Sequence, residues 1–168
     1  MLRITSRHNP RLRDTAQLLA SARERRKAGR CVIEGEHLVA VYADRHGAPE
    51  VLVVSEPYLV RPGVEALCRR FGERTLVVPE ALFASLAVLP AGVGMLAVVP
   101  TPRPRASDGG DFCVLLEDVQ DPGNAGSILR SAAAAGVTHV FMSPHCAFAW
   151  APKVMRAGMG AHFHLEIH

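Results

Sequence analysis

Aromatic side chains are scarce in this 168-residue chain, at 5% of the residues. They are not interleaved with the basic residues either, so a platform on which single-stranded bases stack is not predicted. The P-loop, H-E-x-x-H and G-x-S-x-G patterns are missing, which gives no support to those classes of enzyme. The 49% hydrophobic and 21% charged residues are typical of a globular protein and exclude wholesale disorder, collagen and coiled coil.

The sequence also lacks the features of a secreted or disulfide-bonded protein. Its start, MLRITSRHNPRLR, has no apolar segment like that of a signal peptide. The cysteines at positions 31, 68, 113 and 146 form no C-x-x-C pair, and three of them lie in or beside apolar runs. This pattern is typical of buried, reduced thiols, so we expect a cytoplasmic protein.

One uncharged stretch, residues 81–102, is long enough to raise the question of a membrane span. Pro90, Gly92 and Gly94 interrupt it, which favours a short helix, a turn and a buried strand over residues 95–99. The two glycines lack the rest of a dinucleotide-binding motif and indicate a turn. We therefore expect no membrane partner.

Positive charge is concentrated at the start of the chain. Residues 1–30, here called the basic segment, hold nine Lys or Arg against two acidic residues, a net charge of +7. The other 138 residues hold ten basic and fourteen acidic residues, a net charge of −4. This distribution predicts a polyanionic partner, nucleic acid first of all. The alternative is an arginine-rich helix that is simply solvated.

Apolar patterns in residues 1–99 predict helices that alternate with short strands. The first helix spans residues 6–28, starts near Asn9-Pro10 and ends at Gly29. Further helices are expected over residues 37–42 and 64–71, and buried strands over residues 31–34, 51–54, 75–78 and 95–99. This alternation indicates an α/β layer sandwich with a largely parallel sheet.

Residues 100–110 have the composition of a linker, with three prolines and two glycines. A second α/β pattern follows, with strands expected over residues 112–116, 137–142 and 163–167 and helices over residues 125–135 and 153–159. Three strands and two helices would leave a parallel sheet partly uncovered.

Polar residues gather directly after the strand at residues 112–116. Pro122-Gly123 fits the centre of a type II turn, which places Asn124 at the N-cap of the next helix. Arg130 follows within that otherwise small and apolar helix. Because open α/β sheets bind ligands at the carboxyl ends of their strands, this corner is the candidate site. The alternative is a structural corner whose arginine reaches a surface carboxylate.

Two pairs of potential metal ligands lie near the end of the chain, His145-Cys146 and His162-x-His164. Neither has the spacing of a structural zinc site, so no metal is expected. His162 and His164 would share one face of the strand at residues 163–167, which predicts an ordinary surface pair.

The run LLEDVQDPGNAGSILRSAAAAGV, residues 115–137, resembles the first signature of the SpoU/TrmH-type RNA 2′-O-ribose methyltransferases. The later KVMRAGMGAHFHL is similar to the next segment of that family, and SRHNPRLR, CVIEGEHLV and GVGMLAVV resemble its auxiliary domain. The resemblance implies an α/β/α substrate-binding sandwich like a ribosomal protein, residues 1–99, and a linker over residues 100–110. Residues 111–168 would then be the first part of a knotted SPOUT domain that uses S-adenosylmethionine.

The resemblance also assigns roles to single residues. Asn124 matches the asparagine that helps to position the catalytic arginine or the ribose, and Arg130 matches the catalytic arginine proposed to activate the ribose 2′-hydroxyl. Since a guanidinium does not deprotonate in proteins, we favour a role in orienting the nucleotide through a phosphate. Glu34 matches a glutamate of the auxiliary domain, whose alternative is a strand-end carboxylate beside a turn. The candidate RNA-binding residues are Arg7, Asn9, Arg11, Arg23, Arg25, Arg26, Lys27, Arg30, Glu34 and Arg156.

The sequence departs from the family in two places. Gly158 stands where the family usually has serine, so a hydroxyl role is excluded there. The two signatures that form the cofactor-binding knot, a glycine-rich loop with N-E-x-x-G and a serine-x-asparagine, are missing. We therefore expect a fragment that recognises ribosomal or transfer RNA but has no cofactor-binding residues, and a homodimer only for a complete protein. The alternatives are a non-catalytic RNA-binding module and a generic α/β nucleotide-binding protein.

Overall fold

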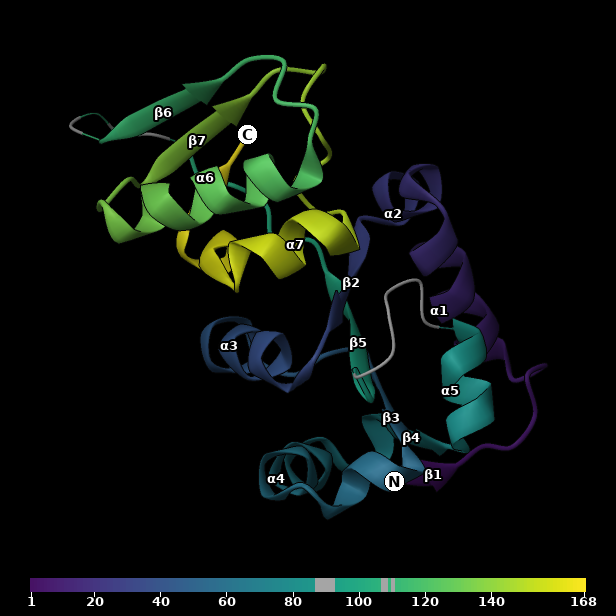
Figure 1. The fold of residues 1–168 in the computed structure, drawn as a ribbon. Coiled ribbons are helices and arrows are strands. Elements are labelled where there is room, and N and C mark those ends of the chain that lie inside the picture. The colour runs from purple at the N-terminus through teal and green to yellow at the C-terminus, as the bar shows by residue number, and fades with distance from the viewer. Residues whose placement is uncertain (87–92, 107–108, 110) are drawn as a thin grey trace. The chain divides into compact units, whose positions relative to one another are not determined.

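The computed structural model divides the chain into two compact units, Met1–Pro100 and Thr101–His168 (Figure 1). It describes residues 1–86, 93–106, 109 and 111–168. Helices account for 49% and strands for 20%, which confirms the α/β class. The turn expected at Pro90 and Gly92 and three positions of the expected linker (107, 108 and 110) lie outside the described residues. Among the helices described, none is long and apolar enough to cross a membrane.

The first unit contains a five-stranded sheet in the order β1-β4-β3-β5-β2. Its strands are β1 (Leu2–Arg3), β2 (Arg30–Glu34), β3 (Val51–Ser55), β4 (Thr75–Val78) and β5 (Met95–Pro100). Strands β1, β4 and β3 are parallel, but β5 is antiparallel to both β3 and β2. Four of the five strands therefore run in the same direction, and the prediction of a largely parallel sheet missed only the reversal of β5. A strand buried on both faces is continuously apolar in either direction, so the pattern did not reveal this reversal.

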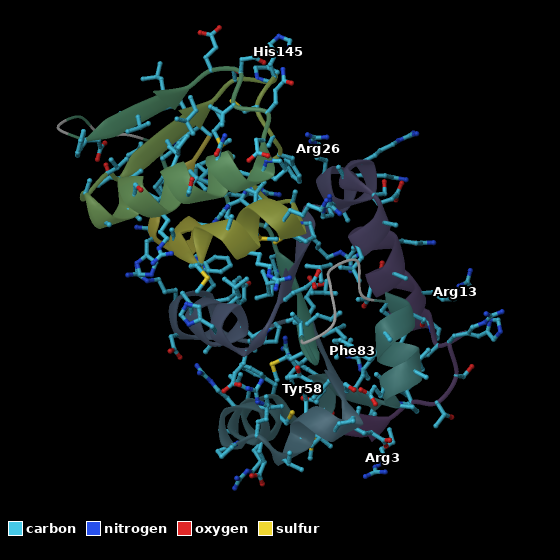
Figure 2. The ribbon with its side chains drawn as sticks, in the orientation of Figure 1. Arg3, Arg13, Arg26, Tyr58, Phe83 and His145 are labelled. Carbon is cyan, nitrogen blue, oxygen red and sulfur yellow. The ribbon has the colours of Figure 1, made fainter. Side chains whose placement is uncertain are left out.

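Helices cover both faces of this sheet. Their bounds are α1 (Pro10–Ala20), α2 (Ala22–Ala28), α3 (Glu36–His46), α4 (Pro62–Phe71) and α5 (Glu80–Leu86), with 3-10 turns at Glu56–Val60 and Gly72–Arg74. Leucines of α1 and Phe83 of α5 pack on Val53 and Leu96 of the sheet, and Figure 2 shows Phe83 pointing inward. Helices α3 and α4 lie on the opposite face (Figure 1). The first unit is thus the expected α/β/α sandwich.

The single helix predicted over residues 6–28 is in fact two. The side chain of Asn9 accepts hydrogen bonds from the backbone N–H groups of Arg11 and Leu12, so α1 begins at Pro10. Ser21 then adopts an extended conformation and its hydroxyl accepts the Glu24 N–H, which starts α2. A serine competes in this way with the continuing helix, although the apolar period passes through it.

The second unit has three parallel strands in the order β6-β7-β8: β6 (Cys113–Leu116), β7 (His139–Met142) and β8 (Glu166–Ile167). Helices α6 (Pro122–Ala134) and α7 (Pro152–Gly158) connect them. Right-handed crossovers that advance in one direction place both helices on one face of the sheet, as Figure 1 shows. On the other face Leu115 is 79% exposed and lies beside Phe141, which is 37% exposed.

The terminal strand predicted over residues 163–167 is shorter than expected: its first two residues belong to a 3-10 turn, Ala161–His164, and only Glu166–Ile167 pairs with β7. The predicted surface pair of histidines is also wrong. His162 is 1% exposed, its Nε2 lies 3.0 Å from the Ala149 carbonyl oxygen, and its ring packs on Trp150. His164 alone is exposed. The alternation of apolar and polar residues imitates a strand because a tight turn can also bury every second side chain.

Candidate functional site

The loop from Glu117 to Asp121 leaves the carboxyl end of β6 and leads into α6. Asp118 has a φ of 54°, in the left-handed region that residues other than glycine seldom adopt. The side-chain amide of Gln120 donates a hydrogen bond to Asp118 Oδ1 at 2.7 Å. The polar residues of the sequence motif therefore form a defined loop where an α/β sheet binds ligands.

Helix α6 begins three residues earlier than the sequence predicted. Asp121, not Asn124, is the N-cap: its Oδ1 accepts the backbone N–H of Asn124 at 2.7 Å. Pro122 and Gly123 form the first helical turn, so the predicted type II turn is also wrong. An aspartate followed by proline is itself a signal for an N-cap and the first helical position, and it could have located this start.

Asn124 and Arg130 both have exposed side chains on α6. Six helical residues separate them by roughly 240° around the axis and roughly 9 Å along it, so they lie on different faces. Arg130 follows Gly126 by one turn and therefore lies near the contact with α7. Arg156 is exposed on α7. It points away from that contact, because the contact is made by Val154, Ala157 and Gly158.

The departure at Gly158 has a structural explanation in His162. A Cβ at position 158 would lie 2.5 Å from Cε1 and 2.7 Å from Nδ1 of that buried ring. Such distances are sterically forbidden, so a side chain at position 158 and this placement of His162 exclude each other. The glycine found in place of serine thus accommodates the histidine.

His162 also makes a specific prediction about acid stability. Burial lowers its pKa to about 4, from 6.5, although the hydrogen bond to the Ala149 carbonyl acts in the opposite direction. The unfolded state therefore binds the proton first as the pH falls from 6.5 towards 4, and stability is lost in that range. We expect the second unit to lose about 2 kcal/mol between pH 7 and pH 5 from this group.

Urea unfolding followed by the fluorescence of Trp150, the one tryptophan of the chain, reports on the second unit and checks this value. His162→Gln should flatten the dependence on pH, whereas His164→Gln, two residues away and exposed, should leave it unchanged. An unaltered slope in His162→Gln would assign the acid sensitivity to other groups.

The basic segment divides into exposed and internally engaged residues. The exposed candidates are Arg7, Arg23, Arg26 and Lys27. Arg13 is exposed as well and points from α1 away from the sheet (Figure 2). Arg25, in contrast, is 6% exposed, and its Nη1 donates to the carbonyl oxygens of Leu18 and Leu19 at the end of α1. This burial argues against the prediction that Arg25 binds RNA. The number of charged residues in a segment does not indicate which of them are buried.

Three further candidates make interactions within the first unit, and a fourth, Glu34, is buried there. Arg30 forms a bidentate ion pair with Asp14: its Nη1 lies 2.7 Å from Oδ2 and its Nη2 lies 2.9 Å from Oδ1. The same Nη1 lies 3.3 Å from Glu50 Oε2. Arg11 is half-buried and donates to the Glu73 carbonyl oxygen. Asn9 caps α1, and Glu34 is buried at the end of β2. None of these interactions needs a nucleic acid to explain it.

Both units match known families. Residues 9–97 match the MRM3-like substrate binding domain, and residues 111–168 match the SpoU rRNA Methylase family. The human protein "rRNA methyltransferase 3, mitochondrial" is 31% identical over 168 residues, 94% of this chain and 39% of the relative. The Bacillus subtilis 23S rRNA (guanosine(2553)-2′-O)-methyltransferase RlmP is 28% identical over 99% of this chain and 64% of its own length.

Solved structures give the same result. An RNA 2′-O ribose methyltransferase aligns with a TM-score of 0.78 and 27% identity, over 99% of this chain and 64% of that one. The AdoMet-bound rRNA methyltransferase from Sinorhizobium meliloti aligns with a TM-score of 0.77 and 25% identity, over 98% and 63%. The chain spans less than two thirds of these relatives. It belongs to the SpoU rRNA methylase family and carries an MRM3-like substrate-binding domain.

Proposed function

We propose that this chain contributes RNA binding and the catalytic arginine to an S-adenosylmethionine-dependent 2′-O-ribose methyltransferase of ribosomal or transfer RNA. The observation that carries the proposal is helix α6, which follows a loop held in an uncommon conformation and exposes Asn124 on its first turn and Arg130 farther along, on a different face. Both units match families of RNA methyltransferases. The activities of the relatives named above support the substrate class.

The chemistry available to Arg130 is that of an orienting cation. Its guanidinium stays charged and can hold a phosphate with two parallel hydrogen bonds, which fixes the neighbouring ribose. The Asn124 amide can donate to or accept from a ribose hydroxyl. Fixed placement of a nucleophilic hydroxyl accounts for a large part of the acceleration in a transfer reaction. We therefore assign positioning of the nucleotide to these two side chains.

We infer that the described residues of the second unit do not form an S-adenosylmethionine site on their own. A hollow of about 350 Å³ at the carboxyl ends of β6 and β7 is lined mainly by apolar side chains, among them Leu115, Phe141 and Met142. The same residues continue into the uncovered face of the sheet, where Leu115 is mostly exposed. We propose that further polypeptide, of the kind that the longer relatives contain, covers this face and completes the cofactor site.

Calorimetric titration tests this proposal directly. We expect the 168-residue chain to show no binding of S-adenosylmethionine stronger than roughly millimolar, which corresponds to about −4 kcal/mol. The Sinorhizobium meliloti rRNA methyltransferase, whose structure contains the cofactor, serves as the positive control. Micromolar binding by this chain would show that the described residues suffice.

We propose that the RNA-binding surface includes Arg23, Arg26 and Lys27, which are all exposed residues of α2. Replacing all three with glutamine should weaken RNA binding and lower its salt dependence. The expected decrease is roughly 0.7–0.9 in log–log slope for each phosphate that these side chains no longer neutralise. Fluorescence anisotropy with labelled ribosomal RNA at several salt concentrations measures both quantities.

A matched variant separates location from net charge. Arg45, Arg61 and Arg69 are exposed arginines of the same unit outside the basic segment. Changing these three to glutamine removes the same charge and should leave the slope nearly unchanged. Equal losses of RNA affinity in both variants would indicate general electrostatic attraction. No loss of affinity in either variant would mean that the basic segment is simply solvated and does not bind RNA.

For the complete protein we propose a homodimer in the cytoplasm. None of the four cysteines, all of which lie in the part of the chain that the structure describes, forms a disulfide bond, which is compatible with a reducing compartment. A non-catalytic RNA-binding module remains the second candidate function, favoured by the missing cofactor signatures. Methyl transfer to RNA distinguishes the two.

A further inference from the structure

A second loop packs against the loop that leads into α6. The turn from Ser143 to Cys146 follows β7, and the backbone N–H of Ser143 donates to the Leu116 carbonyl at 2.9 Å. The N–H of Ala147 donates to the Val119 carbonyl at 2.8 Å. The Ser143 hydroxyl in turn accepts the N–H of Asp118 at 3.3 Å. Backbone and side-chain groups that follow β7 thus contact the last residue of β6 and two positions of the loop that leads into α6.

The thiol of Cys146 completes this arrangement. Its Sγ accepts the N–H of Val119 at 3.4 Å and donates to the Leu116 carbonyl at 3.3 Å. The thiol is half-buried and also lies 3.6 Å from the Ser143 hydroxyl. A thiol is a weak hydrogen-bonding group, but here it forms hydrogen bonds with backbone groups that precede and follow Asp118, the Leu116 carbonyl and the Val119 N–H.

The residue between those groups, Asp118, has an unfavourable backbone geometry. Asp118 lies in the left-handed region, which costs a residue with a Cβ about 1–2 kcal/mol unless its neighbours hold it there. Three residues farther on, Asp121 caps α6 through the N–H of Asn124. The direction in which α6 leaves the sheet therefore depends on a loop that the Ser143–Cys146 turn holds in place.

We propose that the turn from Ser143 to Cys146 is a positioning element for the α6 corner, with the Cys146 thiol and Ser143 hydroxyl as its positioning residues. It fixes Asp118 and Val119 and thereby the capped first turn that presents Asn124. Its meaning for methyl transfer rests on the function proposed above. The positioning itself can be measured without catalysis.

Amide hydrogen exchange of the 168-residue chain, followed by NMR, is the test. In Cys146→Ala the amides of Val119 and Asn124 should exchange roughly three- to tenfold faster than in the wild type. In Ser143→Ala the exchange of the Asp118 amide should be accelerated more than that of Val119 or Asn124, because the Asp118 N–H donates its hydrogen bond to the Ser143 hydroxyl. Cys146→Ser should restore part of the protection, since a hydroxyl also donates and accepts.

Cys113→Ala is the matched control. Cys113 is also half-buried, and its thiol donates to the Asp111 carbonyl at the opposite end of β6, away from the α6 corner. This variant should leave the exchange of Val119 and Asn124 unchanged. Trp150 fluorescence during urea unfolding shows whether each variant keeps the stability of the second unit.

Two results would overturn the proposal. One is unchanged exchange at Val119 and Asn124 in Cys146→Ala. The other is a uniform acceleration across the second unit in proportion to a loss of stability, which would make Cys146 an ordinary stabilising residue. In a form of the protein with a complete catalytic domain, Cys146→Ala should lower kcat while the KM for RNA changes little. Failure of a form with a complete catalytic domain to methylate RNA would refute the proposed function and leave the exchange result intact.

Discussion

Replacing Gly126 with alanine is expected to destabilise the second unit by about 3 kcal/mol. Gly126 lies where α6 crosses α7, and a Cβ there would be 2.5 Å from the Val154 carbonyl oxygen and 2.8 Å from the Gly158 nitrogen. Both atoms belong to the backbone of α7, so no side-chain rotation can relieve the overlap. The helices would have to separate, which would loosen the packing around the buried Leu129.

Gly123→Ala provides the control on the same helix. There the added Cβ would meet only the Asp121 Oδ1, at 3.0 Å, on the exposed first turn. Because alanine favours the helix, this variant should stay within about 1 kcal/mol of the wild type. Urea unfolding followed by Trp150 fluorescence measures both. Equal stability of the two variants would mean that the α6–α7 crossing is not as tight as described.

The elements themselves were largely predictable. The β-branched runs at Val51–Val54 and Thr75–Val78 correspond to β3 and β4, because such runs are favourable only where both faces of a strand are buried. The alternation with amphipathic helices indicated the α/β class. The uncovered face of the second sheet also followed from the count of helices and strands, and the exposed Leu115 now marks it.

Properties that depend on distant partners were not predictable. The antiparallel direction of β5 is determined by its pairing with β2 and β3, and no local pattern encodes it. Arg25 is surrounded by basic residues in the sequence, yet tertiary folding places its guanidinium on the carbonyls that end α1. His162 is buried because Gly158 leaves room for its ring, a relation that only the folded turn creates.

The candidate site shows the same division. Its location after β6 is predicted by the polar run at the end of an apolar strand, and the roles proposed for Asn124 and Arg130 rest on the resemblance to a family. The N-cap was misassigned by three residues because Pro122-Gly123 is compatible with both a turn and a helix start. The contribution of Cys146 could not be foreseen, since it depends on two loops that meet only at the edge of the sheet.

Arg130→Ala is expected to have the largest effect on the proposed reaction. The guanidinium is exposed on α6, near the contact with α7, and would orient the nucleotide without acting as a base. Removing such a fixed charge should lower kcat by about 10²-fold or more. RNA affinity should change little, because the phosphate contacts proposed for the first unit are retained. Arg130→Lys keeps the charge but not the planar fork, so it should recover only part of the rate.

The most direct measurement is transfer of a labelled methyl group from S-adenosylmethionine to RNA by a form of the protein with a complete catalytic domain, with the modified nucleosides identified by mass spectrometry. The account predicts 2′-O-methylnucleosides from the wild type, and about 10²-fold slower turnover in Arg130→Ala with RNA affinity nearly unchanged. Methylation of a base, or an Arg130→Ala defect confined to RNA affinity, would contradict it.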